Sequence, residues 1–236
     1  MLNAKSIPTP TEVVSSPFKL GFGNEITLVD TAGLRKLSKI KDKIEYYSTL
    51  RTQNAVFNCN LALVLIDAEK GFGKQDKSIV DQVISKGKAL IFIVNKWDKI
   101  EKSTSTMKEF EEEVRSQYRE LDHFPILFIS STTKQRINKV LEIAWTVYER
   151  SKKSIPTNKL NVLIEKVMNE NPPPAEKGKV IKINYSVQVH KQPAVIALFA
   201  NYPRLIKISY QRYLMNQIRS HFNLKGIPIR LSFRKK

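Results

Sequence analysis

The chain has 236 residues, of which 42% are hydrophobic and 9% aromatic, so it can bury the core of one large domain or of two smaller ones. Its single cysteine, Cys59, excludes an intramolecular disulfide and suits a reducing compartment. No run approaches the roughly 18 consecutive apolar residues that cross a bilayer, and the first residues lack the apolar region of a secretory signal. We therefore expect a soluble cytoplasmic protein, with an organelle matrix as the alternative.

The net charge of +18 is distributed unevenly along the chain. Residues 151–236 contain 17 of the 40 Lys and Arg residues but only 3 of the 22 Asp and Glu residues, and so carry +14 of the total. A field of that sign attracts polyanions, of which nucleic acid is the commonest. We expect a nucleic-acid or ribonucleoprotein partner; a basic surface that only keeps the protein soluble is the alternative interpretation.

Four apolar runs in the first two thirds of the chain each end in polar residues. They are 25–30, ending in Asp30-Thr31-Ala32-Gly33; 61–66, followed by Asp67; 89–94, followed by Asn95-Lys96-Trp97-Asp98; and 126–129, followed by Ser130-Ser131. Apolar residues recur at helical spacing in the segments between and after the later runs, at 74–86, 107–121 and 137–151. Unbroken apolar strands alternating with helices predict a doubly wound α/β domain, whose ligand site lies beyond the carboxyl ends of the strands.

A second domain is predicted after the basic, proline-containing segment 151–157. Its sequence pattern predicts a helix at 159–169, strands at 180–189 and 194–200, a helix at 202–222 and a strand at 227–233. The run Pro172-Pro173-Pro174 ends the first helix. We expect two domains, residues 1–153 and residues 154–236, the second of α+β class.

The tetrapeptide Asn95-Lys96-Trp97-Asp98 is the most informative motif. A carboxylate can accept both the N1 hydrogen and the exocyclic amine of guanine, whereas adenine offers an acceptor at N1, so Asp98 suits guanine. Asn95 would supply an amide to the base or to a neighbouring loop, and Lys96 would lay its aliphatic stem along the base plane. A capped turn after a strand is the alternative for this motif taken alone.

Two other strand ends agree with a nucleotide site. In Asp30-Thr31-Ala32-Gly33 the aspartate can hold Mg²⁺ through its water shell, and the glycine lets a backbone N–H approach a γ-phosphate. At Ser130-Ser131-Thr132 a backbone N–H could meet the guanine O6. Each motif has a plain turn as its alternative, but their agreement across three strand ends predicts a GTP site.

These motifs resemble those of the Der family of bacterial GTPases, also called EngA, and the resemblance covers nearly the whole chain. It extends through Leu34-Arg35-Lys36 and Glu45-Tyr46-Tyr47-Ser48 to a tail that includes Phe199-Ala200-Asn201-Tyr202-Pro203 and Gly226-Ile227-Pro228-Ile229-Arg230. Members of that family have two GTPase domains followed by a KH-like domain, and act in assembly of the large ribosomal subunit. The resemblance implies a P-loop-NTPase-like GTPase domain, then a small KH-like domain, with GTP or GDP and Mg²⁺ as cofactors.

The sequence departs from that family at the phosphate end of the site. The phosphate-binding loop Gly-x-x-x-x-Gly-Lys-Ser/Thr does not occur in this chain, and Gly73-Lys74 is not a substitute because Gln75 follows it. We therefore expect an N-terminally truncated member with weakened phosphate affinity. The family's Gly-Thr-Thr-Arg-Asp segment corresponds to residues 8–12, where either Thr9 or Thr11 would sense Mg²⁺. No catalytic base is evident, because Leu34 stands where other GTPases place a glutamine.

The KH-like region also departs from RNA-binding KH domains, since residues 172–236 contain no Gly-x-x-Gly loop to clamp an RNA backbone. RNA contact is therefore predicted from charge, through Arg230, Arg234, Lys235 and Lys236, with a solvated basic tail as the alternative. The resemblance implies a monomer whose partners are the large ribosomal subunit and rRNA, with neither DNA nor a membrane. The leading prediction is a GTP-binding ribosome-assembly protein; the rival is a catalytically inactive ribosome-binding or rRNA-binding module that keeps the GTPase scaffold.

Overall fold

The computed structural model describes residues 15–19, 25–29, 56–101, 103 and 105–235, and the chain divides into two compact units, Met1–Asn58 and Cys59–Lys236. In the first unit β1 (Ser15–Lys19) pairs antiparallel with β2 (Glu25–Val29). Four of the five residues of β2 are exposed, so the prediction of a buried strand of a parallel sheet at 25–30 is wrong. An apolar run favours a strand but does not specify its partner, and here the partner of β2 is the antiparallel β1.

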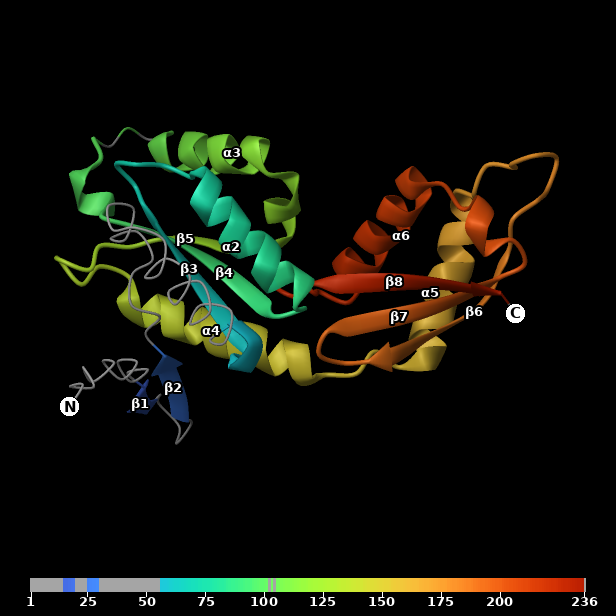
Figure 1. Ribbon diagram of the computed structural model, residues 1–236, viewed down its shortest axis with the longest axis horizontal. Coiled ribbons are helices and arrows are strands. Elements are labelled where there is room, and N and C mark those ends of the chain that lie inside the picture. The colour runs from blue at the N-terminus through green and yellow to red at the C-terminus, as the bar shows by residue number, and fades with distance from the viewer. Residues whose placement is uncertain (1–14, 20–24, 30–55, 102, 104, 236) are drawn as a thin grey trace, which may run out of the picture. The chain divides into compact units, whose positions relative to one another are not determined.

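The second unit begins with a parallel sheet of three strands, in the order β3-β4-β5 (Figure 1). The strands and the helices between and after them occupy nearly the predicted segments: β3 (Leu61–Asp67), α2 (Lys74–Ser85), β4 (Ala89–Asn95), α3 (Thr106–Gln117), β5 (Ile126–Phe128) and α4 (Ile137–Lys152). Two 3₁₀ turns, η3 (Trp97–Lys99) and η4 (Arg119–His123), lie beside α3 in the sequence. The predicted α/β alternation is confirmed.

The central strand β4 is covered on both faces. Its residues 89–94 are all buried, and alternate side chains enter different clusters. Ile91 and Ile93 share a core cluster with Val140 of α4, while Val94 packs with Trp97 on the other side. This two-sided burial explains the unbroken apolar run in the sequence. In contrast, β3 pairs only with β4 among the described strands, and its Leu65 is 53% exposed.

The remainder of the second unit forms a three-stranded sheet with two helices. Its elements are α5 (Thr157–Glu170), β6 (Ile183–His190), β7 (Ala194–Ala200), η5 (Pro203–Leu205), α6 (Ile208–His221) and β8 (Ile229–Lys235). β7 lies in the middle, antiparallel to β6 and parallel to β8. The predicted order of helix, strand, strand, helix, strand is confirmed. The second helix begins later than predicted, because Pro203 opens a separate 3₁₀ turn and Lys207 is extended.

One core joins this α+β part to the parallel sheet. The cluster that contains Ile91 of β4 continues through Leu160 of α5 to Ile196 of β7. Two backbone hydrogen bonds cross the boundary between these two parts, which we call the seam. The Leu90 N–H donates to the Gly226 carbonyl at 2.9 Å, and the Gly226 N–H donates to the His123 carbonyl at 2.8 Å. A shared core and shared backbone bonds favour unfolding of residues 59–236 as one cooperative unit.

Candidate functional site

The polar residues that end the three parallel strands gather at one edge of the sheet. Asp67 of β3 is the register partner of Asn95 of β4, so these two ends lie side by side. The loops that follow are joined by backbone hydrogen bonds: Ala68 donates to the Asn95 carbonyl at 2.9 Å, and Trp97 donates to the Ile129 carbonyl at 3.0 Å. The edge that sequence reasoning selected is therefore a connected set of loops.

Asn95 links the loop after β4 to the loop after β5. Its side-chain oxygen Oδ1 accepts a hydrogen bond from the Lys96 N–H at 2.8 Å and another from the Ser131 N–H at 3.0 Å. Sequence reasoning left open whether this amide would serve a base or a neighbouring loop. In the structure the oxygen serves the loop, which fixes the backbone that carries Asp98.

Removing this oxygen should loosen both loops. Asn95→Ala leaves two backbone donors without their acceptor, and we expect it to lower the free energy of unfolding by about 1 to 2 kcal/mol. Asn95→Asp keeps an acceptor oxygen of the same size and should retain most of that stability. Urea denaturation of both variants measures the difference, and equal losses would show that the two hydrogen bonds do not hold the loops.

Lys96 occupies the left-handed backbone region, with φ of 62° and ψ of 31°. Its ammonium lies 2.8 Å from Asp67 Oδ2 and 3.6 Å from Glu69 Oε2. The hydrogen bond with Lys96 lowers the pKa of Asp67, and the same bond raises the pKa of Lys96. The ammonium group of Lys96 is thus anchored at the end of β3, so its aliphatic stem runs from the end of β4 to the end of β3.

Trp97 anchors the turn that presents Asp98. It is 4% exposed, and its ring centroid lies 4.5 Å from that of Phe128 and 5.6 Å from that of Phe110. Asp98 follows in the same 3₁₀ turn and has an exposed side chain. Sequence reasoning did not single out this aromatic cluster. An aromatic residue between polar motif residues was the available signal, since such a residue has to find an apolar surface nearby.

The turn after β5 is closed by its own hydrogen bonds. Ser130 is fully buried, and its hydroxyl oxygen accepts from the Thr133 N–H at 3.0 Å. Ser131 is exposed, and its N–H already donates to Asn95. A carbonyl group of a bound base would therefore need another donor of this turn, such as the N–H of Thr132.

Several predicted site residues lie outside the described part of the chain: Thr9, Thr11, Asp30, Thr31, Ala32, Gly33 and Lys236. The predicted RNA contacts that are described belong to β8. Arg230 donates from Nη2 to the Ser85 carbonyl at the end of α2, and Arg234 donates from Nε to the Ser232 hydroxyl at 3.3 Å. Lys235 is exposed. Among the described helices, none combines the length and the apolar character that crossing a bilayer requires.

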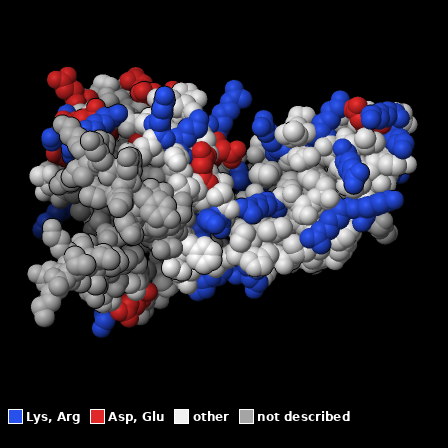
Figure 2. Space-filling model, in the orientation of Figure 1, with Lys and Arg blue, Asp and Glu red and all other residues white. Residues whose placement is uncertain are grey.

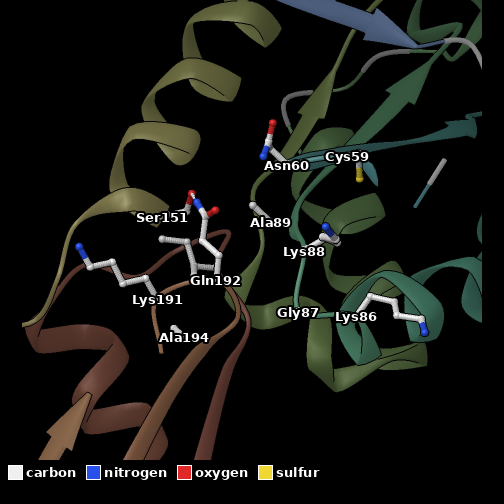
Figure 3. A pocket seen from close by; sticks show the side chains of 11 residues that line it. Cys59, Asn60, Lys86, Gly87, Lys88, Ala89, Ser151, Lys191, Gln192 and Ala194 are labelled. Atoms are coloured by element: carbon white, nitrogen blue, oxygen red, sulfur yellow. Dashed lines mark hydrogen bonds between the residues drawn. The ribbon is translucent and has the colours of Figure 1, made fainter. Parts of the chain in front are cut away.

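A pocket of about 90 Å³ lies at the opposite, amino-terminal ends of β3 and β4 (Figure 3). Its walls come from Cys59 and Asn60, from residues 86–89, and from Lys191 and Gln192 in the turn between β6 and β7. Figure 3 shows the side chains of Lys86 and Lys191 extending away from each other, so their charges do not converge on one ligand. This pocket is separate from the strand ends that carry Asn95.

Comparisons with known proteins agree with an α/β domain that is followed by a smaller α+β domain. Residues 21–150 match the model of the elongation factor Tu GTP binding domain, and residues 154–234 match that of the C-terminal KH-domain-like region of EngA bacterial GTPase enzymes. GTPase Der of Desulforamulus reducens is 44% identical over 228 residues, which are 97% of this chain and 52% of that protein. GTPase Der of Chloroherpeton thalassium is 40% identical with the same coverage. The chain thus spans about half the length of these curated relatives.

A solved structure supports the fold independently of the curated sequences. A variant of Aquifex aeolicus Era, crystallised with GDP and an aluminium fluoride, superposes with a TM-score of 0.50 at 18% identity. The match covers 95% of this chain and 80% of the Era chain. At that identity the likeness concerns the arrangement of helices and strands alone.

Proposed function

Because the chain belongs to the Der (EngA) family of GTPases, we propose that it binds guanine nucleotide at the carboxyl ends of β3, β4 and β5 and acts in assembly of the large ribosomal subunit. The observation that carries the proposal is the bridge from Asn95 to the N–H groups of Lys96 and Ser131. That bridge holds the loop after β4 against the loop after β5, where a purine ring would meet both.

Asp98 is the residue proposed to select guanine. Its carboxylate is exposed on a turn that the buried Trp97 fixes, and it can accept from the N1 and exocyclic N–H groups of guanine together. Lys96, with its head held by Asp67, offers its stem as a flat apolar surface for the ring. Ser130 and Ser131 close the site from the side of β5.

The phosphate end is proposed to lie at Asp30-Thr31-Ala32-Gly33, with Mg²⁺ held through water by Asp30 and sensed by Thr9 or Thr11. We propose that the affinity of this chain for the phosphates is low, because no Gly-Lys-Ser or Gly-Lys-Thr loop occurs in its sequence. The proposal also includes domain limits at 1–153 and 154–236, a monomeric state and a cytoplasmic location.

Titration of the chain with GDP, ADP and xanthosine diphosphate in Mg²⁺, followed by NMR, tests the base site. We expect GDP to bind more weakly than micromolar, yet clearly better than ADP. Asp98→Asn keeps the shape of the side chain but replaces one acceptor oxygen by a donor, so GDP affinity should fall at least about tenfold while xanthosine diphosphate gains. Equal binding of GDP and ADP would contradict the base site, and tight Mg²⁺-dependent GTP binding would contradict the proposed low affinity.

The second candidate function is a nucleotide-independent ribosome-binding or rRNA-binding module. It is favoured by the charge of +14 within residues 151–236 and by the missing phosphate loop. Cosedimentation with large ribosomal subunits separates the two functions. If GTP changes the bound fraction of the wild type and Asp98→Asn removes that change, the chain acts as a GTP-dependent factor. If neither GTP nor the substitution changes the bound fraction, the chain acts as the nucleotide-independent module.

A further inference from the structure

The two faces of the β6-β7-β8 sheet differ. On one face Ile196, Leu198 and Ala200 of β7 are fully buried and belong to the core that α5 and α6 complete. The alternate residues of β7 lie on the opposite face, where Phe199 is half-buried. Figure 1 shows the strands passing in front of α5, so this second face, which we call the open face, is turned towards the viewer.

One row of side chains on the open face, which we call the stacking row, places two aromatic rings in line with a guanidinium group. Tyr185 of β6 is the register partner of Phe199, and Phe199 is the register partner of Arg234 of β8. The rings of Tyr185 and Phe199 have centroids 6.0 Å apart at an interplanar angle of 41°. Tyr185 is 45% exposed, and Arg234 is exposed. Apolar ring surface is therefore held in solvent by rigid strands rather than by a loop.

The positive charge around the open face indicates a negatively charged partner. The segment 151–236 has only 3 acidic residues, and two of them are already paired: Glu170 with Lys166 at 3.7 Å and Glu176 with Lys207 at 2.8 Å. Figure 2 shows Lys and Arg side chains around a largely uncharged surface on this part of the molecule. Positive charge beside exposed rings fits a polyanion that itself carries flat rings.

We propose that the open face binds single-stranded RNA, with a base stacked on Tyr185 and Phe199 and a backbone phosphate held by Arg234. Every base has a π-face that can stack on an aromatic ring, but the bases of a duplex are covered by their neighbours. The residues between 172 and 236 offer no Gly-x-x-Gly clamp, so the sheet supplies the contact instead. This inference rests on the proposed function, in which rRNA is the partner.

Fluorescence anisotropy with a labelled oligouridine and a blunt RNA duplex of equal length tests the stacking row. We expect the single strand to bind more tightly, and Tyr185→Leu and Phe199→Leu each to weaken it by about tenfold or more. Tyr148→Leu, on the half-buried Tyr148 of α4, is the matched control and should leave affinity unchanged. Arg234→Gln should weaken binding and reduce the slope of log affinity against log salt by about one.

The outcomes separate this inference from the proposed function. Circular dichroism first establishes that each variant is folded. If duplex and single strand bind alike, or if both leucine variants bind as the wild type does, the stacking row is wrong even where large subunits still cosediment with the chain. If neither RNA nor large subunits bind the wild type, the inference and its premise fail together.

Discussion

Gly87→Ala is expected to lower the free energy of unfolding by about 2 to 5 kcal/mol, because it forces the two sheets of the second unit apart. Gly87 has φ of +68°, a region that costs a residue with a Cβ atom about 1 to 2 kcal/mol. An added Cβ would also overlap the Cβ of Pro193 and lie 2.8 Å from its Cγ and 3.0 Å from its Cα. Relieving that overlap requires movement of the segment between β6 and β7.

Gly71→Ala is the matched control for this substitution. Gly71 has nearly the same backbone angle, φ of +66°, but a Cβ atom there would meet nothing within 4 Å. It should therefore cost only the backbone strain, about 1 to 2 kcal/mol. Urea denaturation measures both variants, and the difference between them isolates the close contact across the seam. Equal losses for the two alanines would show that the seam is looser than the structure places it.

Arg219→Met should raise the free energy of unfolding, by about 1 to 3 kcal/mol. Arg219 of α6 is 9% exposed, and its Nε and Nη1 atoms are buried without a hydrogen-bond partner in the described part of the chain. A buried donor without an acceptor retains the cost of its lost hydration. Methionine fills a similar volume and has no donor to satisfy. Thermal and urea denaturation measure the gain.

The pH dependence of that gain follows from the titration of Arg219. Burial lowers its pKa to about 10, while the nearby Glu120 favours the charged form. The folded protein binds this proton less tightly than the unfolded chain, so the cost is fully present below about pH 10 and declines only above it. The advantage of Arg219→Met should thus be constant between pH 6 and 9. Arg212→Met, at an exposed position of the same helix, should change stability little, and a similar gain there would refute the role of burial.

The elements that depend on local pattern were predictable from the sequence. The helix at 74–86 and the strand at 194–200 agree with α2 (Lys74–Ser85) and β7 (Ala194–Ala200), because helical spacing and apolar runs are properties of neighbouring residues. The pairing of β2 was not predictable in the same way. Pairing depends on which distant strand is available, and the run 26–29 carries no information about that.

At the candidate site, the sequence predicted that these strand ends lie at one edge of the sheet, but it did not predict the contacts among them. Residue type and position pointed to Asn95, Asp98 and Ser131, and the structure places Asn95 against the Ser131 N–H. The ion pair of Lys96 with Asp67 joins residues far apart in the sequence, and the packing of Trp97 on Phe128 does the same. Such contacts follow from the folded arrangement, which no local spacing encodes. The contact between Gly87 and Pro193 was missed for the same reason.

The bonds made at both ends of β4 limit how its length can change. Near its start the Leu90 N–H is bonded to the Gly226 carbonyl, and at its end Asn95 holds the loop that carries Asp98. Side chains alternate between faces along a strand, so inserting or deleting one residue would turn every later side chain to the wrong layer. Genes that encode this fold should therefore tolerate substitution within β4 far more readily than any change in the number of its codons.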